Sequence, residues 1–205
     1  MSCVDDIYEK YTTNKDIIEK LLKITKNETT KIVIDEDIKG NYYTFFNNTI
    51  YIGKDIQNIK DKFEDKVNSL IVMAHEVIHS TQNKKIHILN FVLSNIYFLC
   101  VALSFIISLF FNNVDSSIFI IICFISLFFS LFFSLFFRQY LELDAIINSE
   151  KLFLKFLDNE SINLKENEKK IVNKNIKIAA VLSFFTNSYK KIILFFIMCL
   201  FIKFI

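Results

Sequence analysis

Two histidines and a glutamate within residues 70–82, LIVMAHEVIHSTQ, have the types and the spacing of a metal site. His75, Glu76 and His79 form the pattern His-Glu-x-x-His. Four residues make a little more than one helical turn, so on a helix both imidazoles project from one face and can reach a single ion. Glu76 then lies beside that ion, where its carboxylate can accept a proton from a metal-activated water. The pattern predicts a zinc hydrolase, with His75 and His79 as ligands and Glu76 as the general base.

The alternative is an accidental match on a core helix. The chain has three histidines, and two of them fall at this spacing. From Phe63 the apolar residues recur at the spacing of an amphipathic helix, which is the element that the motif requires. These apolar positions are Phe63, Val67, Leu70, Ile71, Ala74, Val77 and Ile78. The local pattern therefore favours the metal site.

A catalytic zinc ion takes three protein ligands and keeps one position for water, so His75 and His79 need a partner. His87 is one candidate, but a continuous helix would place it about 12 Å beyond His79 along the axis, too far to share the ion. We expect His87 to lie at the edge of a membrane segment without a ligand role. Glu142 and Asp144 are better placed, because a helical hairpin returns the chain to the side that it left.

Long apolar blocks predict a membrane protein. Hydrophobic residues make up 53% of the chain, and phenylalanine alone occurs 24 times. The runs Ile88–Phe111 and Ile118–Phe137 are each long enough to cross a hydrocarbon core of about 30 Å, and a short polar segment separates them. A buried helical hairpin in a soluble protein is the alternative, which the length of these runs and their lack of charge disfavour. We expect a transmembrane hairpin.

Charged residues around the hairpin predict its orientation. Lys84, Lys85 and Arg138 flank its outer ends, whereas its short loop contains only Asp115. By the positive-inside rule the loop lies outside and both long flanks lie in the cytoplasm. The charges at 61–66 and 84–85 also place the motif outside the bilayer, which disfavours an intramembrane protease.

The two ends of the chain differ in polarity. The first thirty residues are polar and charged and lack the apolar stretch of a signal peptide, so we expect the N-terminal part to stay on the side where it is made. At the other end, Ile192–Ile205 is apolar apart from Lys203. This segment predicts a third helix that is associated with the membrane or spans it.

The region before the motif contains short helices and strands. Asp5–Lys26 has helical spacing that is broken near residues 12–14, which predicts one or two surface helices. Residues 31–38, 42–46 and 49–52 predict two or three strands that end in a hairpin. In a peptidase this hairpin could present an edge strand to an extended substrate, or it could simply cover the core.

Together these elements predict a mainly α-helical membrane protein with a small β-hairpin or sheet and a zincin-like site split by a transmembrane helical hairpin. We expect four parts. Residues 1–87 carry the hairpin and the metal-binding helix on the cytoplasmic side, and residues 88–137 form the transmembrane hairpin. Residues 138–190 return to the cytoplasm with the third ligand, and residues 191–205 form a C-terminal membrane helix.

Charge and cysteine content exclude other classes. The 24 basic and 22 acidic residues are interleaved and give a net charge of +2, so there is no basic stripe for nucleic acid. The four cysteines, at positions 3, 100, 123 and 199, contain no Cys-x-x-Cys pair. We expect buried free thiols rather than a disulfide framework.

A larger set of residues resembles a known family. Residues 74–79 (AHEVIH) with Gln82, the following hairpin, and residues 141–145 (LELDA) are similar to the membrane-anchored neutral zinc metallopeptidases of the bacterial YugP type. The resemblance implies that Glu142 is the third ligand and that Asp144 supports the site by orienting a ligand histidine. The reverse assignment stays open, because two residues so close on a helix cannot both face the ion.

The resemblance covers roughly Tyr42–Tyr189, and its Glu-x-Asp-Ala element makes it more specific than the metal motif alone. Two features depart from the family. Ile78 stands where members usually have glycine, which puts bulk close to the metal. The N-terminal membrane segment that members usually carry is not expected here.

The predicted function is that of a membrane-bound zinc metalloendopeptidase with one zinc ion, whose active site lies near the cytoplasmic membrane surface. Its expected partners are the bilayer and a peptide or membrane-protein substrate, with no nucleic acid. An oxyanion donor is also required, and Tyr140, Asn148 and Tyr43 are the candidates. The competing hypothesis is a non-catalytic membrane adaptor or scaffold with a structural or vestigial metal site.

Overall fold

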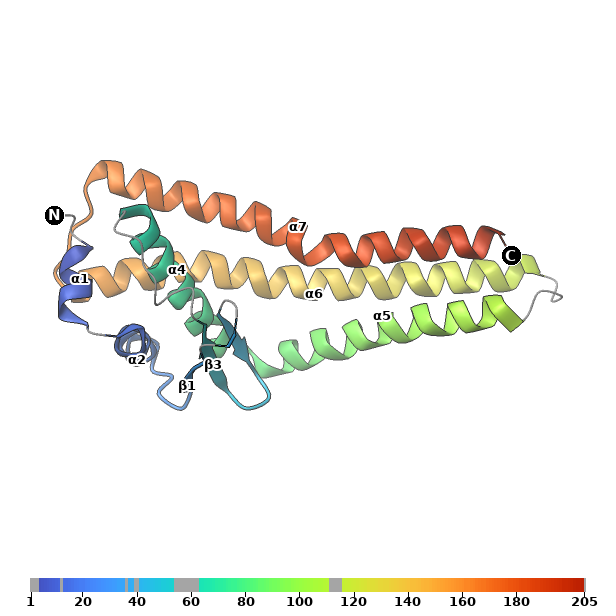
Figure 1. The fold of residues 1–205 in the computed structure, drawn as a ribbon, viewed down its shortest axis with the longest axis horizontal. Helices are drawn as coiled ribbons and strands as arrows, with labels where there is room; N and C mark the ends of the chain where they lie inside the picture. Colours follow the sequence, from blue (N-terminus) through green and yellow to red (C-terminus); the bar gives the residue numbers. More distant parts are fainter. Residues whose placement is uncertain are drawn as a thin grey trace. The chain divides into compact units, whose positions relative to one another are not determined.

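A computed structural model describes residues 4–11, 13–35, 37–38, 41–53, 63–110 and 116–204. The helices are α1 (Asp5–Lys10), α2 (Asn14–Thr25), α4 (Phe63–Thr81), α5 (Lys84–Phe110), α6 (Ser116–Asn159) and α7 (Glu166–Phe204). The strands are β1 (Lys31–Ile34), β2 (Tyr42–Thr44) and β3 (Thr49–Ile52). The prediction of a mainly helical protein with a small sheet is confirmed (Figure 1).

The chain divides into two compact units. The sheet unit comprises Met1–Asn83 and Leu143–Ala180, and the span unit comprises Lys84–Glu142 and Val181–Ile205. Helices α6 and α7 each pass through both units, because the divisions at 142–143 and 180–181 fall inside them.

The small sheet has the strand order β1-β3-β2. The predicted hairpin is confirmed, since β2 pairs antiparallel with β3 and Tyr43 lies opposite Ile50. Its turn includes Asn48 with φ at 51°, a left-handed conformation that asparagine tolerates better than most residues. Strand β1 joins the other side of β3 in parallel, so β3 is central and β1 and β2 are the edges.

Helices α1 and α2 are separate, as the broken spacing predicted. Helix α2 begins after Thr13, whose hydroxyl accepts from the backbone N–H of Asp16 while the Asp16 carboxylate accepts from the Thr13 backbone N–H. This reciprocal capping satisfies two donors that the first helical turn leaves open. Both are surface helices as predicted, and their buried apolar side chains face the core. The buried residues are Ile7, Ile17, Ile18, Leu21 and Leu22.

Helix α4 is the central helix of the sheet unit and packs against α2, β2 and β3. Its buried apolar side chains recur at helical spacing and join one core with α2 and with Ala145 and Phe153 of α6. The predicted polar segment 54–62 before this helix lies outside the described residues. Because α4 is packed against the core from Val67 onward, that packing fixes the orientation of the helix turn that carries the motif.

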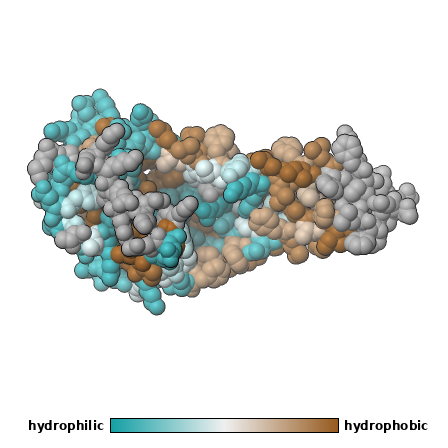
Figure 2. Space-filling model, in the orientation of Figure 1, coloured by the Kyte–Doolittle hydropathy of each residue, from teal (hydrophilic) through white to brown (hydrophobic). Residues whose placement is uncertain are grey.

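The span unit contains α5, the first part of α6 and the last part of α7, which run alongside one another (Figure 1). Its interior is built on Tyr97, Leu127, Leu131, Phe195 and Met198. Its outer face carries exposed apolar side chains, seen as the brown surface of this unit in Figure 2. A surface of this kind is compatible with lipid rather than water.

Three helices are long and apolar enough to cross a membrane, within Lys84–Ile106, Ile121–Asn159 and Glu166–Leu200. The two predicted spans and the continuation of the second beyond Arg138 are confirmed as helices. The predicted C-terminal helix is the end of the much longer α7, which contains Lys190 and Lys191 in its interior. The loop predicted between the first two spans lies largely outside the described residues.

One polar cluster links the three helices of the span unit. The Lys191 ammonium of α7 donates to Ser94 Oγ of α5 at 3.0 Å and also to Ser134 Oγ of α6. The Tyr97 hydroxyl donates to the Lys191 carbonyl at 2.8 Å. Polar groups among membrane helices are expected to find partners in this way. We call this group the Lys191 clamp.

Candidate metal centre

Helix α4 places the motif at the boundary of its buried face. His79 and Glu76 are buried, with 8% and 7% of their surface exposed, and His75 is partly exposed. Ala74, Val77 and Ile78 around them are buried in the core. The packing therefore holds this turn of the helix in place and leaves one imidazole accessible from outside.

The two imidazoles converge as their spacing predicted. His75 Nε2 and His79 Nε2 lie 3.0 Å apart, and the ring planes are nearly perpendicular at 89°. A tetrahedral ion with metal–nitrogen bonds of about 2.0–2.1 Å separates two ligand nitrogens by about 3.3 Å. The pair thus has nearly the separation that two ligands of one ion require.

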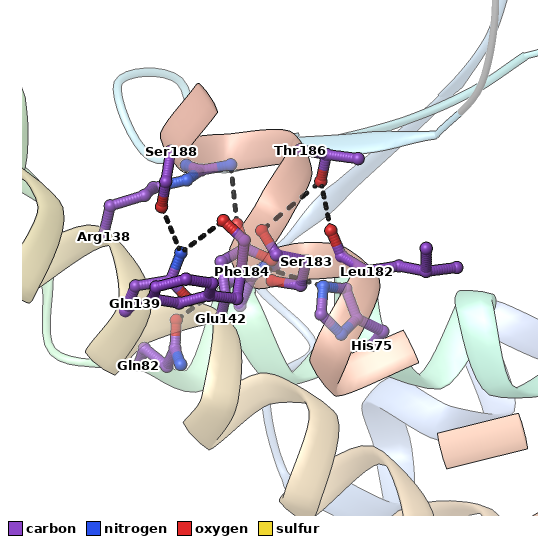
Figure 3. A network of polar contacts seen from close by, with 11 residues as sticks. His75, Gln82, Arg138, Gln139, Glu142, Leu182, Ser183, Phe184, Thr186 and Ser188 are labelled. Carbon is purple, nitrogen blue, oxygen red and sulfur yellow. Dashed lines mark hydrogen bonds and ion pairs between the residues drawn. The ribbon is translucent and has the colours of Figure 1, made fainter. Parts of the chain in front are cut away.

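Glu142 completes a group of three. Ligand atoms of His75, His79 and Glu142 all lie within 4.8 Å of one another. Glu142 is one peptide bond from Leu143, where the sheet unit resumes within the same helix. Glu142 is 7% exposed, and its carboxylate pairs with Arg138, with Nη2 and Oε1 2.6 Å apart, as Figure 3 shows. Arg138 precedes it by four residues, so the pair lies along one face of α6.

Asp144 takes a different position from Glu142. Its Oδ2 accepts a hydrogen bond from Gln82 Nε2 at 2.8 Å, and its Oδ1 accepts from Asn148 Nδ2 at 2.8 Å. Gln82 in turn contacts His79, with 2.8 Å between Gln82 Oε1 and His79 Nδ1. Of the two carboxylates, Glu142 is therefore the one grouped with the imidazoles, while Asp144 reaches His79 through Gln82.

His87 is buried at 9% exposure and does not belong to this group. The continuous helix assumed for it does not exist, since α4 ends at Thr81 and α5 begins at Lys84. Ser80 is held beside this break by Asn27, whose amide donates to the Ser80 carbonyl and hydroxyl at 2.9 Å. A distance along one helix axis was therefore the wrong basis for judging His87.

The three candidate oxyanion donors have different surroundings. The Tyr43 hydroxyl donates to Asn48 Oδ1 at 3.0 Å within the hairpin, and burial raises its pKa above the usual value. The Asn148 amide donates to Asp144. Tyr140 is 51% exposed on α6. The role of oxyanion donor stays a prediction for all three.

The donor set fits a divalent transition metal. Two imidazole nitrogens and one carboxylate oxygen are ligands that zinc accepts, and three protein ligands leave a position for water. Iron, cobalt, nickel and copper also accept such donors, so the group does not identify the metal. The three residues thus form a group that could hold a metal ion.

Sequence reasoning assigned no role to two residues around the metal group. In the sequence, Gln82 stands just after the motif, and Arg138 stands out only as a charge at one end of the hairpin. Their spacings contained a signal, because Gln82 follows His79 by three residues and Arg138 precedes Glu142 by four, which are neighbouring positions on a helix. The pairing of Gln82 with Asp144 had no such signal, since 62 residues separate them.

Comparisons with protein-family models, with curated proteins and with solved structures gave no match for this chain.

Proposed function

We propose that this chain is a membrane-bound zinc metalloendopeptidase, similar in its site to the bacterial YugP type. The observation that carries the proposal is the group of His75, His79 and Glu142, with Glu76 next to the first of these ligands on the same buried turn. A histidine pair with a structural role would need neither a third ligand nor an adjacent buried carboxylate. A peptidase needs both.

Each residue has a separate task in this proposal. His75 and His79 offer neutral nitrogen donors, and Glu142 adds one negative charge. A bound zinc ion polarises the scissile carbonyl and acidifies water, which is the chemistry that the protein cannot supply alone. Glu76 accepts the proton of the attacking water and passes it to the leaving amine. Burial of Glu76 limits its contact with bulk water.

The sheet offers an edge strand for an extended substrate. Strand β2 is an edge strand that contacts α4, and Tyr42 on it is 40% exposed and stacks on Tyr51 at 5.0 Å between ring centroids. Peptides commonly bind by adding a strand to such an edge. This arrangement supports the choice of a peptide as substrate over a small molecule.

The decisive test is the variant Glu76→Gln of the full chain in detergent or nanodiscs. It removes the proton acceptor and keeps the size of the side chain, so we expect one bound zinc ion per chain as in the wild type but at least about a hundredfold less proteolysis, since general-base catalysis contributes about 10²–10⁴-fold. Zinc is measured by elemental analysis, and proteolysis by cleavage of a quenched fluorescent peptide library.

Glu64→Gln is the matched control, because Glu64 is an exposed glutamate on the first turn of the same helix. Its activity should equal that of the wild type. If Glu76→Gln cleaves peptides at the wild-type rate, the peptidase proposal is wrong. If the wild type binds zinc and cleaves nothing in the library, the adaptor or scaffold hypothesis is favoured.

A further inference from the structure

We propose that Asp144 and Gln82 form a positioning relay that keeps the proton of neutral His79 on Nδ1 and so presents the Nε2 lone pair to the metal. The inference rests on the proposed metal site and concerns how that site is prepared. Neither Asp144 nor Gln82 touches the metal in this scheme. Both act through His79.

The direction of hydrogen bonding begins at Asp144. A carboxylate only accepts hydrogen bonds, so each amide beside it must present its nitrogen. Asn148 satisfies this requirement independently, since Lys151 donates to Asn148 Oδ1 at 3.3 Å and an ammonium can only donate. The Asn148 oxygen therefore faces Lys151, and its nitrogen faces Asp144 at 2.8 Å.

The same logic orients Gln82. Its nitrogen faces Asp144 at 2.8 Å, so its oxygen faces His79 Nδ1, also at 2.8 Å. A carbonyl oxygen cannot donate, and the contact is a hydrogen bond only if His79 Nδ1 carries the proton. A neutral imidazole has one N–H, which leaves Nε2 as a lone pair facing His75 Nε2 at 3.0 Å.

Metal binding is weakened if the hydrogen bonds of the relay run in the opposite direction and the proton lies on His79 Nε2. A histidine protonated on Nε2 would have to move its proton before it could bind a metal through that atom. Ligand histidines usually donate their second ring N–H to a fixed acceptor, and loss of such an acceptor typically lowers metal affinity about 10–100-fold. Here the acceptor is an amide, which could face either way, and Asp144 is what selects its direction.

Two substitutions at Asp144 and Asn148 separate a relay from simple packing. In Asp144→Asn the oxygen of the new amide accepts from Asn148 and its N–H donates to Gln82. The Gln82 amide then has to turn, so that its oxygen faces residue 144 and its N–H faces His79 Nδ1. This arrangement favours the proton on His79 Nε2. In the double variant Asp144→Asn/Asn148→Asp, the carboxylate at 148 accepts from Lys151 and from the amide at 144. The oxygen of that amide then accepts from Gln82 Nε2, as the Asp144 carboxylate does in the wild type. The original direction is restored with the same atoms in nearly the same volume.

The first measurement is the ¹⁵N spectrum of histidine-labelled, metal-free protein at a pH where imidazole is neutral. The chain has three histidines, so the signals can be assigned with single substitutions. We expect His79 to be protonated on Nδ1 in the wild type and the double variant, and on Nε2 in Asp144→Asn. A wild-type proton on Nε2 would overturn the relay.

The second measurement is zinc affinity by competition with a chromophoric chelator. Asp144→Asn and Gln82→Met should each bind zinc about 10–100-fold more weakly, and the double variant should recover to within a few-fold of the wild type. Wild-type affinity in both single variants, or a double variant no better than Asp144→Asn, would contradict the proposal. If the relay and zinc binding are found but no proteolysis, the peptidase function fails and the relay stands.

Discussion

Glu142 and Asp144 are two residues apart on α6 and have opposite relations to the metal group. Glu142 lies with His75 and His79, whereas Asp144 accepts hydrogen bonds from Gln82 and Asn148. Removing a ligand and removing a positioning residue should therefore have different consequences. A ligand contributes one of three bonds to the ion, while a positioning residue only improves a bond that another side chain makes.

Glu142→Ala should lose zinc binding at free zinc concentrations that saturate the wild type. Asp144→Ala should still bind one zinc ion at saturation, with affinity lowered about 10–100-fold. Titration with a chromophoric chelator measures both. Glu150→Ala on the same helix serves as a control and should bind zinc as the wild type does. If Asp144→Ala loses zinc while Glu142→Ala keeps it, the two roles are exchanged.

At the scale of single residues, the sequence predicted the candidate ligands but not the residues that form hydrogen bonds with them. His75 and His79 share a helix turn, so their convergence follows from helical geometry alone. The hairpin topology narrowed the third ligand to Glu142 or Asp144, and the family resemblance was needed to choose Glu142, because nothing local links it to His79 and His75, 63 and 67 positions earlier. Gln82 could not be assigned at all, because the direction in which its amide points depends on Asp144 and Asn148, which approach it only in the folded chain.

Among the elements, the turn between α6 and α7 is tied to the N-terminal helices by one carboxylate. Glu160 accepts from the Tyr11 hydroxyl at 2.7 Å and from the Lys10 ammonium, and Lys20 is 3.8 Å away. Burial alone would raise the pKa of Glu160, but the hydrogen bonds from Lys10 and Tyr11 and the charges of Lys10 and Lys20 outweigh it and hold the pKa below its usual range. The ionised form is thus favoured in the folded chain.

This shift predicts a pH dependence. Because the pKa of Glu160 is lower in the folded than in the unfolded chain, its stabilisation is complete above the ordinary value of 4.5 and is lost as the pH falls through the folded value. Glu160→Gln should be less stable than the wild type at neutral pH, and the difference should narrow below about pH 4.5. Denaturant unfolding across this pH range measures the difference in the free energy of unfolding.

Glu9→Gln, an exposed change on α1, is the control and should give no such difference. If the difference between Glu160→Gln and the wild type stays constant in acid, the assignment is wrong.

The Lys191 clamp makes a prediction for the span helices. Lys191→Ala removes two hydrogen bonds between helices but leaves Ser94 Oγ and Ser134 Oγ 3.3 Å apart, so neither hydroxyl is stranded. Hydrogen bonds between membrane helices contribute about 0.6–2 kcal/mol each, so we expect a loss of about 1–3 kcal/mol. Unfolding of the detergent-solubilised protein with SDS measures it.

Lys190→Ala is the matched control for the clamp. Lys190 is exposed, and its ammonium lies 5.9 Å from the ring centroid of Tyr189. Exposed cation–π contacts are worth about 0.5–1 kcal/mol, so this change should cost less than Lys191→Ala. Equal losses for the two variants would mean that the clamp adds nothing beyond a generic surface charge.

The elements were predicted best where one periodicity dominated. The spans α5 and α6 follow from apolar runs longer than a bilayer core requires. The break between α4 and α5 was missed, because Gln82 and Asn83 contain neither of the strong helix breakers glycine and proline. Helix α7 was predicted only in part, since Lys190 and Lys191 interrupt its apolar run. Lys191 is accommodated by Ser94 and Ser134. These two serines lie on other helices, so a local sequence pattern does not reveal them.

At the scale of the whole molecule, one helix connects a candidate membrane span with a candidate metal ligand. Glu142 follows Phe137, the last residue of the apolar run, by five residues of uninterrupted helix, or about 8 Å along the axis. The third ligand is therefore held close to where α6 leaves its apolar run. For a peptidase, this geometry favours substrates that are anchored in the same bilayer.

The corresponding experiment compares one cleavable peptide in two forms, soluble and joined to a single transmembrane anchor, with the full chain in nanodiscs. Confinement to one disc raises the effective concentration of the anchored peptide at the site, so we expect its kcat/KM to be higher by about tenfold or more. In detergent above its micelle-forming concentration, where enzyme and anchor occupy separate micelles, the advantage should shrink. Glu76→Gln should cleave neither form, which excludes a contaminating protease. Equal rates for both forms in nanodiscs would show that the position of Glu142 near the end of its span does not select the substrate.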